Sequence, residues 1–279
     1  MTSILFGFTS AIAWGTGDFA GGIASRRASA YRATLYGEAV GLAMLLAAAV
    51  VVRESPMPWQ DWAWCVLAGA LGATGLLILY RSMVESQMSL AAPISGLMAA
   101  ALPVIVGSLL QGLPGPATFL GFALALLAVW LVSQAEGAPP QALARLSELR
   151  LPLISGVCFG MYFILIHQGS QHALLWPMIA ARCSGTISLT IFAVHQREVR
   201  LPASTLLPWV LLNAAGDIGG NTFYILAGQA GRMDVAAVLG SLYPGMTVIL
   251  AWLLLKEKIT RLQLAGILAA LAAIVLLTL

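Results

Sequence analysis

Charged side chains are scarce in this sequence. Only 9% of the 279 residues are Asp, Glu, Lys or Arg, whereas 60% are hydrophobic. A soluble domain of this size needs far more charge to cover its surface, so a soluble fold is excluded. The formal net charge is only +3 and the chain has no dense basic block, which argues against a nucleic-acid partner.

Cysteine and histidine are also rare, with three residues of each type. Cys65, Cys158 and Cys183 stand alone within apolar stretches, a pattern typical of packed thiols and not of a disulfide framework. The histidines are too far apart in sequence to indicate a metal site. We therefore expect neither a metal ion nor a cofactor.

Apolar runs of about twenty residues recur along the whole chain, and each is long enough to cross a hydrocarbon core of roughly 30 Å. Continuous runs of this length indicate helices and not the short alternating strands of a membrane barrel. The sequence predicts an all-α membrane protein with ten transmembrane helices. The predicted spans are 3–24, 33–52, 62–80, 88–111, 116–134, 151–167, 174–194, 206–228, 234–255 and 261–279.

The one long polar interruption is "QAEGAPPQALARLSELR", residues 134–150. Its two consecutive prolines break any helix there, and "QALARLSELR" is expected to form a short amphipathic turn at the membrane interface. The interruption divides the chain into a five-helix half, residues 1–134, a linker, residues 135–150, and a second five-helix half, residues 151–279.

The two halves match without a gap when one is shifted by 145 positions. The shift aligns Trp64 with Trp209 and Gly75 with Gly220, and it extends to Ser10 and Ser155 in the first span of each half. One shift that serves residues in different spans indicates an internal repeat. An odd number of spans in each repeat inverts the second half, as in many secondary transporters whose solute sites lie at the midplane between the halves.

Basic residues are distributed unevenly between the two ends of the predicted helices. Eleven of them fall on one side, whereas only Arg53 and Arg232 fall on the other. Such asymmetry supports the ten-span arrangement, because one missing or additional helix would scramble it. The positive-inside rule places the eleven in the cytoplasm and both termini outside.

The eighth span carries a polar stripe. Asn213, Asp217, Asn221 and Tyr224 fall within an arc of about 80° of helix. A carboxylate near the bilayer centre costs on the order of 2.5 kcal/mol or more, so the stripe is predicted to face a hydrated interior. A substrate or proton-coupling role for Asp217 and a purely structural role both fit this position.

Arg182 is the only basic residue deep inside a predicted span, and Asp217 is its expected partner. The two residues form either a structural ion pair or a site for a zwitterion, with Arg182 binding a carboxylate and Asp217 with Asn221 binding an amine. Glu38 is expected to reach water or to pair with Arg26, Arg27 or Arg32 at the end of its span, and the same reading competes with a site role for Asp18.

Aromatic residues and prolines complete the set of candidates. Trp14 lies one turn before Asp18, and Tyr80, Tyr162 and Tyr243 are predicted to contribute to an amphipathic cavity wall. Prolines are expected to bend the fourth and ninth spans, because proline cannot donate a hydrogen bond to the helical ladder. These prolines are Pro93, Pro103 and Pro244.

The segment "SLYPGMTVILAWLLLKEKITRLQLAGILAALAAIVLL", residues 241–277, together with "AWGTGDF" and the five-plus-five repeat, resembles the drug/metabolite transporter superfamily and specifically its EamA-type ten-helix carriers. The resemblance implies a basket of ten helices whose central cavity is lined by the first, third and fourth helices of each half. By position, Pro244, Trp14, Gly15 and Glu257 match family residues, although the first half has "QGLPG" and no counterpart of Glu257. Relatives are generally drawn with cytoplasmic termini, contrary to the charge distribution here.

The sequence thus predicts a secondary transporter in the inner membrane of a bacterium, working as a monomer and exporting small metabolites by alternating access. Zwitterionic amino acids are the favoured solutes. The alternatives are a non-transporting membrane sensor or assembly partner and an intramembrane aspartyl protease. For the protease, "GTGD" spells Gly-x-Gly-Asp at residues 15–18, and Asp217 would be the second carboxylate beside Asp18. The other motifs of that chemistry are missing.

Overall fold

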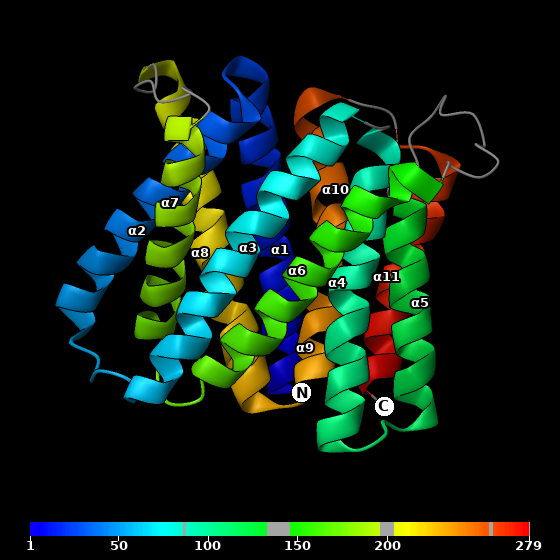
Figure 1. The fold of residues 1–279 in the computed structure, drawn as a ribbon. Coiled ribbons are helices and arrows are strands. Elements are labelled where there is room, and N and C mark those ends of the chain that lie inside the picture. The colour runs from blue at the N-terminus through cyan, green and yellow to red at the C-terminus, as the bar shows by residue number, and fades with distance from the viewer. Residues whose placement is uncertain (86–87, 133–145, 196–203, 257–258, 279) are drawn as a thin grey trace.

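A computed structural model describes residues 1–85, 88–132, 146–195, 204–256 and 259–278, and all regular secondary structure in these ranges is helical (Figure 1). The helices are α1 (Thr2–Arg27), α2 (Ala30–Val52), α3 (Trp59–Glu85), α4 (Met88–Gln111), α5 (Pro116–Val132), α6 (Leu146–Gly169), α7 (Leu175–His195), the short 3-10 helix η1 (Ser204–Leu206), α8 (Leu207–Ala230), α9 (Met233–Gly240), α10 (Tyr243–Leu255) and α11 (Arg261–Thr278).

Each predicted span falls on a helix, but the ninth is divided into α9 and α10. The break lies at Ser241 and Leu242, and Pro244 is among the first residues of α10. A proline at this position lacks an N–H and its ring clashes with the carbonyl four residues earlier, so α9 cannot continue through it. The fourth span, by contrast, remains one continuous helix.

Five segments are long and apolar enough to cross a membrane by length and hydropathy, counted over the described residues. They are Tyr31–Val52, Trp59–Ile78, Arg150–Gly169, Leu175–His195 and Met233–Leu255. α8 is not among them, because Asn213, Asp217 and Asn221 lower its hydropathy. α2 and α7, which carry Glu38 and Arg182, are among the five, so a helix with a single charged residue can still meet this hydropathy.

Helices of the two halves pack against each other in reciprocal pairs. α1 packs on α8 as α6 packs on α3, and α1 packs on α9 and α10 as α6 packs on α4. The hydrogen bonds repeat the pattern, because Ser10 Oγ donates to the Gly220 carbonyl and Ser155 Oγ donates to the Gly75 carbonyl, both at 2.8 Å. Each partner in one bond lies 145 positions from its equivalent in the other. The internal repeat is therefore structural as well as sequential.

The first helices of the two halves, α1 and α6, run in opposite directions. In Figure 1, α1 begins at the lower end of the bundle, next to the N label, whereas α6 begins at the upper end. The last helix, α11, ends at the lower end, where α1 begins. Counting α9 and α10 as one and leaving out η1, the described residues form ten long helical segments.

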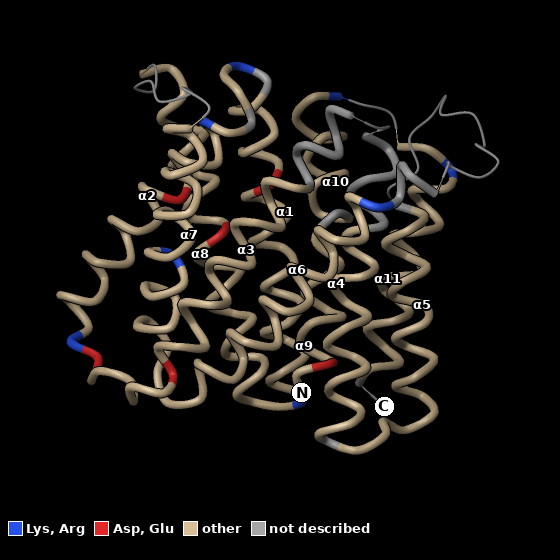
Figure 2. Tube along the Cα trace, viewed as in Figure 1, with Lys and Arg blue, Asp and Glu red and all other residues tan. Residues whose placement is uncertain are grey.

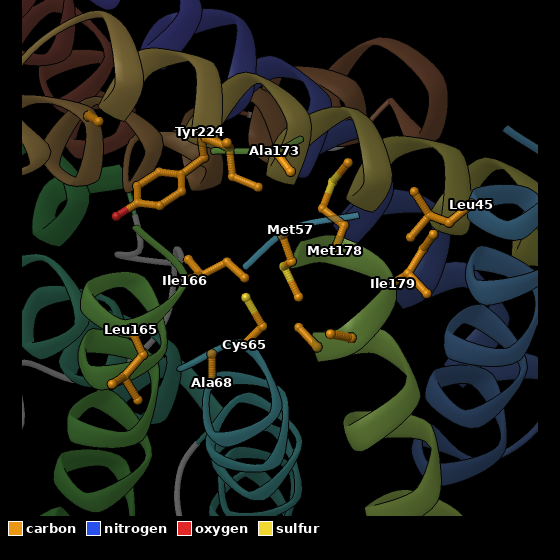
Figure 3. Packing of buried hydrophobic residues seen from close by; sticks show 14 of the residues in the cluster. Leu45, Met57, Cys65, Ala68, Leu165, Ile166, Ala173, Met178, Ile179 and Tyr224 are labelled. Carbon is orange, nitrogen blue, oxygen red and sulfur yellow. The ribbon is translucent and has the colours of Figure 1, made fainter. Parts of the chain in front are cut away.

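Small residues bring the helices close together. A Cβ atom placed on Gly216 of α8 would lie only 2.6 Å from Gly17 Cα of α1, so these two helices meet backbone to backbone. Small residues permit this close approach in membrane bundles, where lipid provides no hydrophobic drive for helix association. Larger apolar side chains fill the space between α3, α6, α7 and α8, including Cys65, Ile166 and Met178 (Figure 3).

The outer surface of the bundle is apolar over most of its height. Large hydrophobic side chains such as Val50, Leu109, Ile187, Leu268 and Val275 are more than half exposed. Figure 2 shows the described Lys and Arg mostly at the upper end, the one opposite the start of α1. An apolar belt between polar ends matches a lipid environment.

Candidate functional site

A cavity of about 240 Å³ lies at the centre of the bundle, where the two halves meet. α1, α2, α3 and α4 of the first half and α6, α7, α8 and α10 of the second half all contribute to its wall. Its lining residues are Trp14, Asp18, Glu38, Leu45, Gly69, Gly72, Ala73, Leu76, Gly96, Ala99, Phe159, Tyr162, Phe163, Met178, Ala181, Arg182, Gly185, Asp217, Ile218, Asn221, Ser241 and Tyr243.

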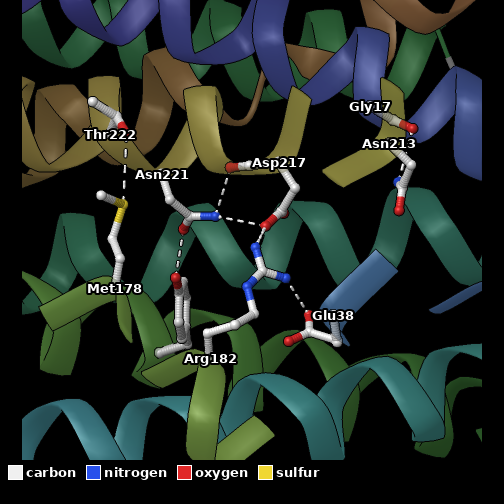
Figure 4. A network of polar contacts seen from close by, with 9 residues as sticks. Gly17, Glu38, Met178, Arg182, Asn213, Asp217, Asn221 and Thr222 are labelled. Atoms are coloured by element: carbon white, nitrogen blue, oxygen red, sulfur yellow. Dashed lines mark hydrogen bonds and ion pairs between the residues drawn. The ribbon is translucent and has the colours of Figure 1, made fainter. Parts of the chain in front are cut away.

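Arg182 of α7 is held between two carboxylates (Figure 4). One terminal nitrogen, Nη1, donates to Glu38 of α2 at 2.6 Å, and the other, Nη2, donates to Asp217 of α8. The Arg182 side chain is only 9% exposed, so an unpaired guanidinium would be costly there. The predicted ion pair between Arg182 and Asp217 is confirmed.

The prediction for Glu38 was wrong. The Glu38 carboxylate lies inside the bundle, where it pairs with Arg182 of α7. The reason is depth, because α2 begins at Ala30 and places Glu38 more than two turns inside the helix.

Glycines make room for this ion pair between α2 and α7. A Cβ atom on Gly41 would lie 3.4 Å from Arg182 Cζ, and one on Gly185 would lie 3.4 Å from a carboxylate oxygen of Glu38. Gly41 of α2 lies beside Arg182 of α7, and Gly185 of α7 lies beside Glu38 of α2. These two glycines are the sequence signal that could have identified Glu38 as the second partner.

Asn221 extends the network along α8 to α6. Its amide nitrogen donates to the Asp217 backbone carbonyl at 2.8 Å and to the Asp217 carboxylate at 3.1 Å. Its amide oxygen accepts from the Tyr162 hydroxyl at 2.5 Å. Four helices, α2, α6, α7 and α8, are thus joined by one chain of polar contacts, which orients the groups at the cavity wall.

Asp18 of α1 stands apart from this network. Its side chain is exposed and lines the cavity, and it has no hydrogen-bond or ion-pair partner among the described residues. Trp14, one turn earlier, also lines the cavity and packs against Phe163 and Tyr224 with ring centroids 5.5 and 5.8 Å apart. Asp18 is therefore a free carboxylate beside an aromatic wall.

The remaining candidates differ in their placement. Tyr243 lines the cavity, but Asn213 and Tyr224 do not. Asn213 donates to the Gly17 carbonyl of α1 at 2.9 Å, and the buried Tyr224 hydroxyl donates to the Phe163 carbonyl at 3.1 Å. These two residues join helices, because the polar stripe is wide enough to touch α1 and α6 as well as the cavity. Tyr80 belongs to α3, and its side chain lies outside the described part.

The cavity is lined by equivalent positions of the two halves. Six pairs of lining residues are equivalent under the shift of 145 positions: Trp14 with Phe159, Asp18 with Phe163, Gly72 with Asp217, Ala73 with Ile218, Leu76 with Asn221, and Gly96 with Ser241. Residues related by the repeat thus face each other across one space. The described residues contain no group of three or more His, Cys, Asp or Glu that could hold a metal ion.

An apolar perimeter, an internal repeat and a polar cavity between the halves together define a multi-pass membrane protein of the transporter class. The chain belongs to the EamA-like transporter family, whose model matches residues 1–134 and 147–279. A protein of known crystal structure is similar over 99% of this chain and 96% of its own, with 16% identity and a TM-score of 0.83, which shows a shared fold. Curated protein sequences give no significant match.

Proposed function

We propose that the chain is a secondary transporter in the cytoplasmic membrane of a bacterium and works there as a monomer. In this proposal ten helical crossings form two inverted halves, residues 1–134 and 151–279, joined by the linker 135–150. The observation that carries the proposal is the cavity between the two halves, because such a position would allow the halves to open it to either side in turn.

The transported solutes that we propose are small metabolites, and amino acids are the first class to test. The cavity volume of about 240 Å³ lies just below the usual range of roughly 300–1,000 Å³ for ligand sites, so it suits a small molecule. A zwitterion would place its carboxylate at Arg182 and its amine at Asp217 and Asn221. Because Arg182 is already paired twice, this carboxylate must compete with Glu38 and Asp217.

We propose export as the direction of transport and Asp217 as the proton-coupling group. Asp217 combines partial exposure at the cavity, 36% for its side chain, with an ion pair to Arg182. A carboxylate in such a position can exchange an ion pair for a proton as access alternates.

The aspartyl protease alternative receives less support from the geometry. Two carboxylates acting as acid and base must be free to face each other, whereas the Asp217 carboxylate is held by Arg182 and Asn221.

Counterflow in liposomes tests the proposal. Purified protein is screened by thermal shift with amino acids, and liposomes preloaded with an unlabelled hit then receive the same labelled solute. We expect saturable uptake above that of protein-free liposomes. Stabilisation by a solute without counterflow would instead identify a sensor. If Arg182→Ala and Asp217→Asn variants that fold bind amino acids as tightly as the parent, the zwitterion arrangement is wrong.

A further inference from the structure

The polarity of the cavity is divided between its two flanks. In four of the six repeat-related pairs one member is polar and the other is not: Asp18 with Phe163, Asp217 with Gly72, Asn221 with Leu76, and Ser241 with Gly96. The polar members belong to α1, α8 and the break after α9, elements that pack together. Their apolar counterparts belong to α6, α3 and α4, which also pack together. The cavity therefore has one polar and one apolar flank.

The cavity lining as a whole carries an excess of negative charge. Three carboxylates, Asp18, Glu38 and Asp217, line the cavity, and Arg182 is the one Lys or Arg among the lining residues. Both terminal nitrogens of the guanidinium already donate to Glu38 and Asp217. The carboxylate that is left for a ligand is that of Asp18, and a cation bound beside it would stabilise its charged form.

Trp14 strengthens the case for a cation next to Asp18. It lies one turn earlier on α1, lines the same cavity and presents an indole ring, the aromatic group that attracts cations best. A carboxylate with a neighbouring ring face is suited to an ammonium group. Phe163, Gly72 and Leu76 also line the cavity and add no charge or hydrogen-bonding side chain, which suits an apolar body. The neighbouring Tyr162 hydroxyl already donates to Asn221.

From this division we infer that the site takes a small cationic amine with an apolar body, whose ammonium group binds Asp18 and whose body lies against α3 and α6. The ligand needs no carboxylate, because Arg182 serves as an internal counter-ion of Glu38 and Asp217. This inference rests on the proposed transport function and replaces amino acids by amines as its solute class.

Three related compounds separate the chemical groups. Phenethylamine has the amine and the ring, phenylalanine adds a carboxylate, and 3-phenylpropionate has the carboxylate without the amine. Binding to the full-length protein in detergent is measured by calorimetry at one pH and salt concentration. We expect phenethylamine to bind at least tenfold more tightly than phenylalanine, and 3-phenylpropionate not to bind. Equal or tighter binding of phenylalanine, or no binding of phenethylamine, would overturn the inference.

Two variants test the role of Asp18. Asp18→Asn keeps the size of the side chain and should weaken phenethylamine binding at least tenfold. Asp61→Asn removes a carboxylate outside the cavity, one that bonds His172 at 2.9 Å, and should leave binding unchanged. Asp18 has no partner among the described residues, so its variant should retain the thermal unfolding temperature of the parent. Unchanged binding by Asp18→Asn would refute the assignment.

Flux measurements distinguish this inference from the proposed function. If phenethylamine binds through Asp18 but no solute shows counterflow, the binding inference stands and the transport function fails. If amino acids show counterflow while phenethylamine neither binds nor competes, the transport function stands and the amine site is wrong. Counterflow of phenethylamine that is lost in Asp18→Asn and kept in Asp61→Asn supports both.

Discussion

At the scale of single residues, the energetics of the site depend on Arg182. Its guanidinium satisfies two carboxylates on different helices, so its removal would leave Glu38 and Asp217 close together without a counter-charge. Like charges in a partly buried site repel each other, and each also loses a charge-assisted hydrogen bond. The three side chains therefore act as a unit, and a single substitution measures more than one contact.

Arg182→Ala should destabilise the protein by roughly 3 kcal/mol, because breaking a buried ion pair by removing one partner leaves uncompensated charge. Thermal unfolding of the purified protein measures the loss. The exposed Arg150 at the start of α6 provides the control, since Arg150→Ala should change little. A variant that also carries Glu38→Gln and Asp217→Asn should recover part of the stability. No recovery would contradict the explanation.

Asp217→Asn should abolish the response of transport to a pH gradient while leaving solute exchange in place, because an amide cannot release a proton. The charged groups at its cavity are Arg182, Glu38 and Asp18, and none of them is altered by this substitution. Liposome flux with and without an imposed pH gradient measures the effect, and Asp61→Asn is the matched control. An unchanged gradient response would remove Asp217 from coupling.

At the scale of helices, contact between α1 and α8 is set by glycine. A Cβ atom on Gly216 would meet the backbone of Gly17, which cannot move aside as a flexible side chain can. Gly22, also on α1, has nothing within 4 Å of the equivalent position. The two glycines provide a matched comparison within one pair of helices.

Gly216→Ala should therefore lower the unfolding temperature and weaken solute binding, since separating α1 from α8 moves Asp18 away from Asp217. Gly22→Ala should be neutral or slightly stabilising, because alanine favours a helix by roughly 1 kcal/mol over glycine. Thermal unfolding and binding are compared for the two variants. Equal effects of both substitutions would exclude the backbone contact as the cause.

Hydropathy and helix-breaking residues were sufficient to predict most helices. They did not predict every contact that holds the helices together. The structure has a helix at every span that hydropathy predicted, and Pro244 lies next to the break that divides the ninth span. The sequence did not indicate that Glu54 caps α7, where its carboxylate accepts from the backbone N–H groups of Leu174 and Leu175, both at 2.8 Å. This contact joins residues about 120 positions apart, and periodicity within one helix carries no information about such contacts.

The candidate site was predictable to a similar degree. Depth in a span identified Arg182 and Asp217, because a charge near the bilayer centre needs a partner. The depth of Glu38 in its span was underestimated, because the predicted span began at residue 33 whereas α2 begins at Ala30. The distinction between Asn221, which lines the cavity, and Asn213, which bonds α1, depends on how neighbouring helices are rotated, and only the packed structure defines that rotation.

At the scale of the whole molecule, the distribution of charge defines an orientation. The described basic residues outside the cavity lie mostly at the end of the bundle opposite the start of α1, whereas Arg53 and Arg232 lie at the same end as that start. Lys and Arg are retained on the cytoplasmic side during insertion, so the start of α1 is predicted to face outward.

A single cysteine at the N-terminus tests this orientation, in a variant whose three natural cysteines are replaced. In intact cells it should react with a membrane-impermeant maleimide. A cysteine at the upper end, placed at Ser29 between α1 and α2, should react only after the cells are opened. The reverse pattern would give the chain the cytoplasmic termini that its resemblance to EamA-type carriers implied.

The separation of the polar flank from the apolar flank also governs how a solute would travel. The proposed alternating access changes the conformations of the two halves, whereas α1 and α8 are packed against each other and would stay together on one side of the passage. The same carboxylates would thus bind the same end of the solute in the outward-open and in the inward-open state. A bound molecule would therefore cross the membrane without reversing its orientation, with the same end next to the polar flank throughout transport.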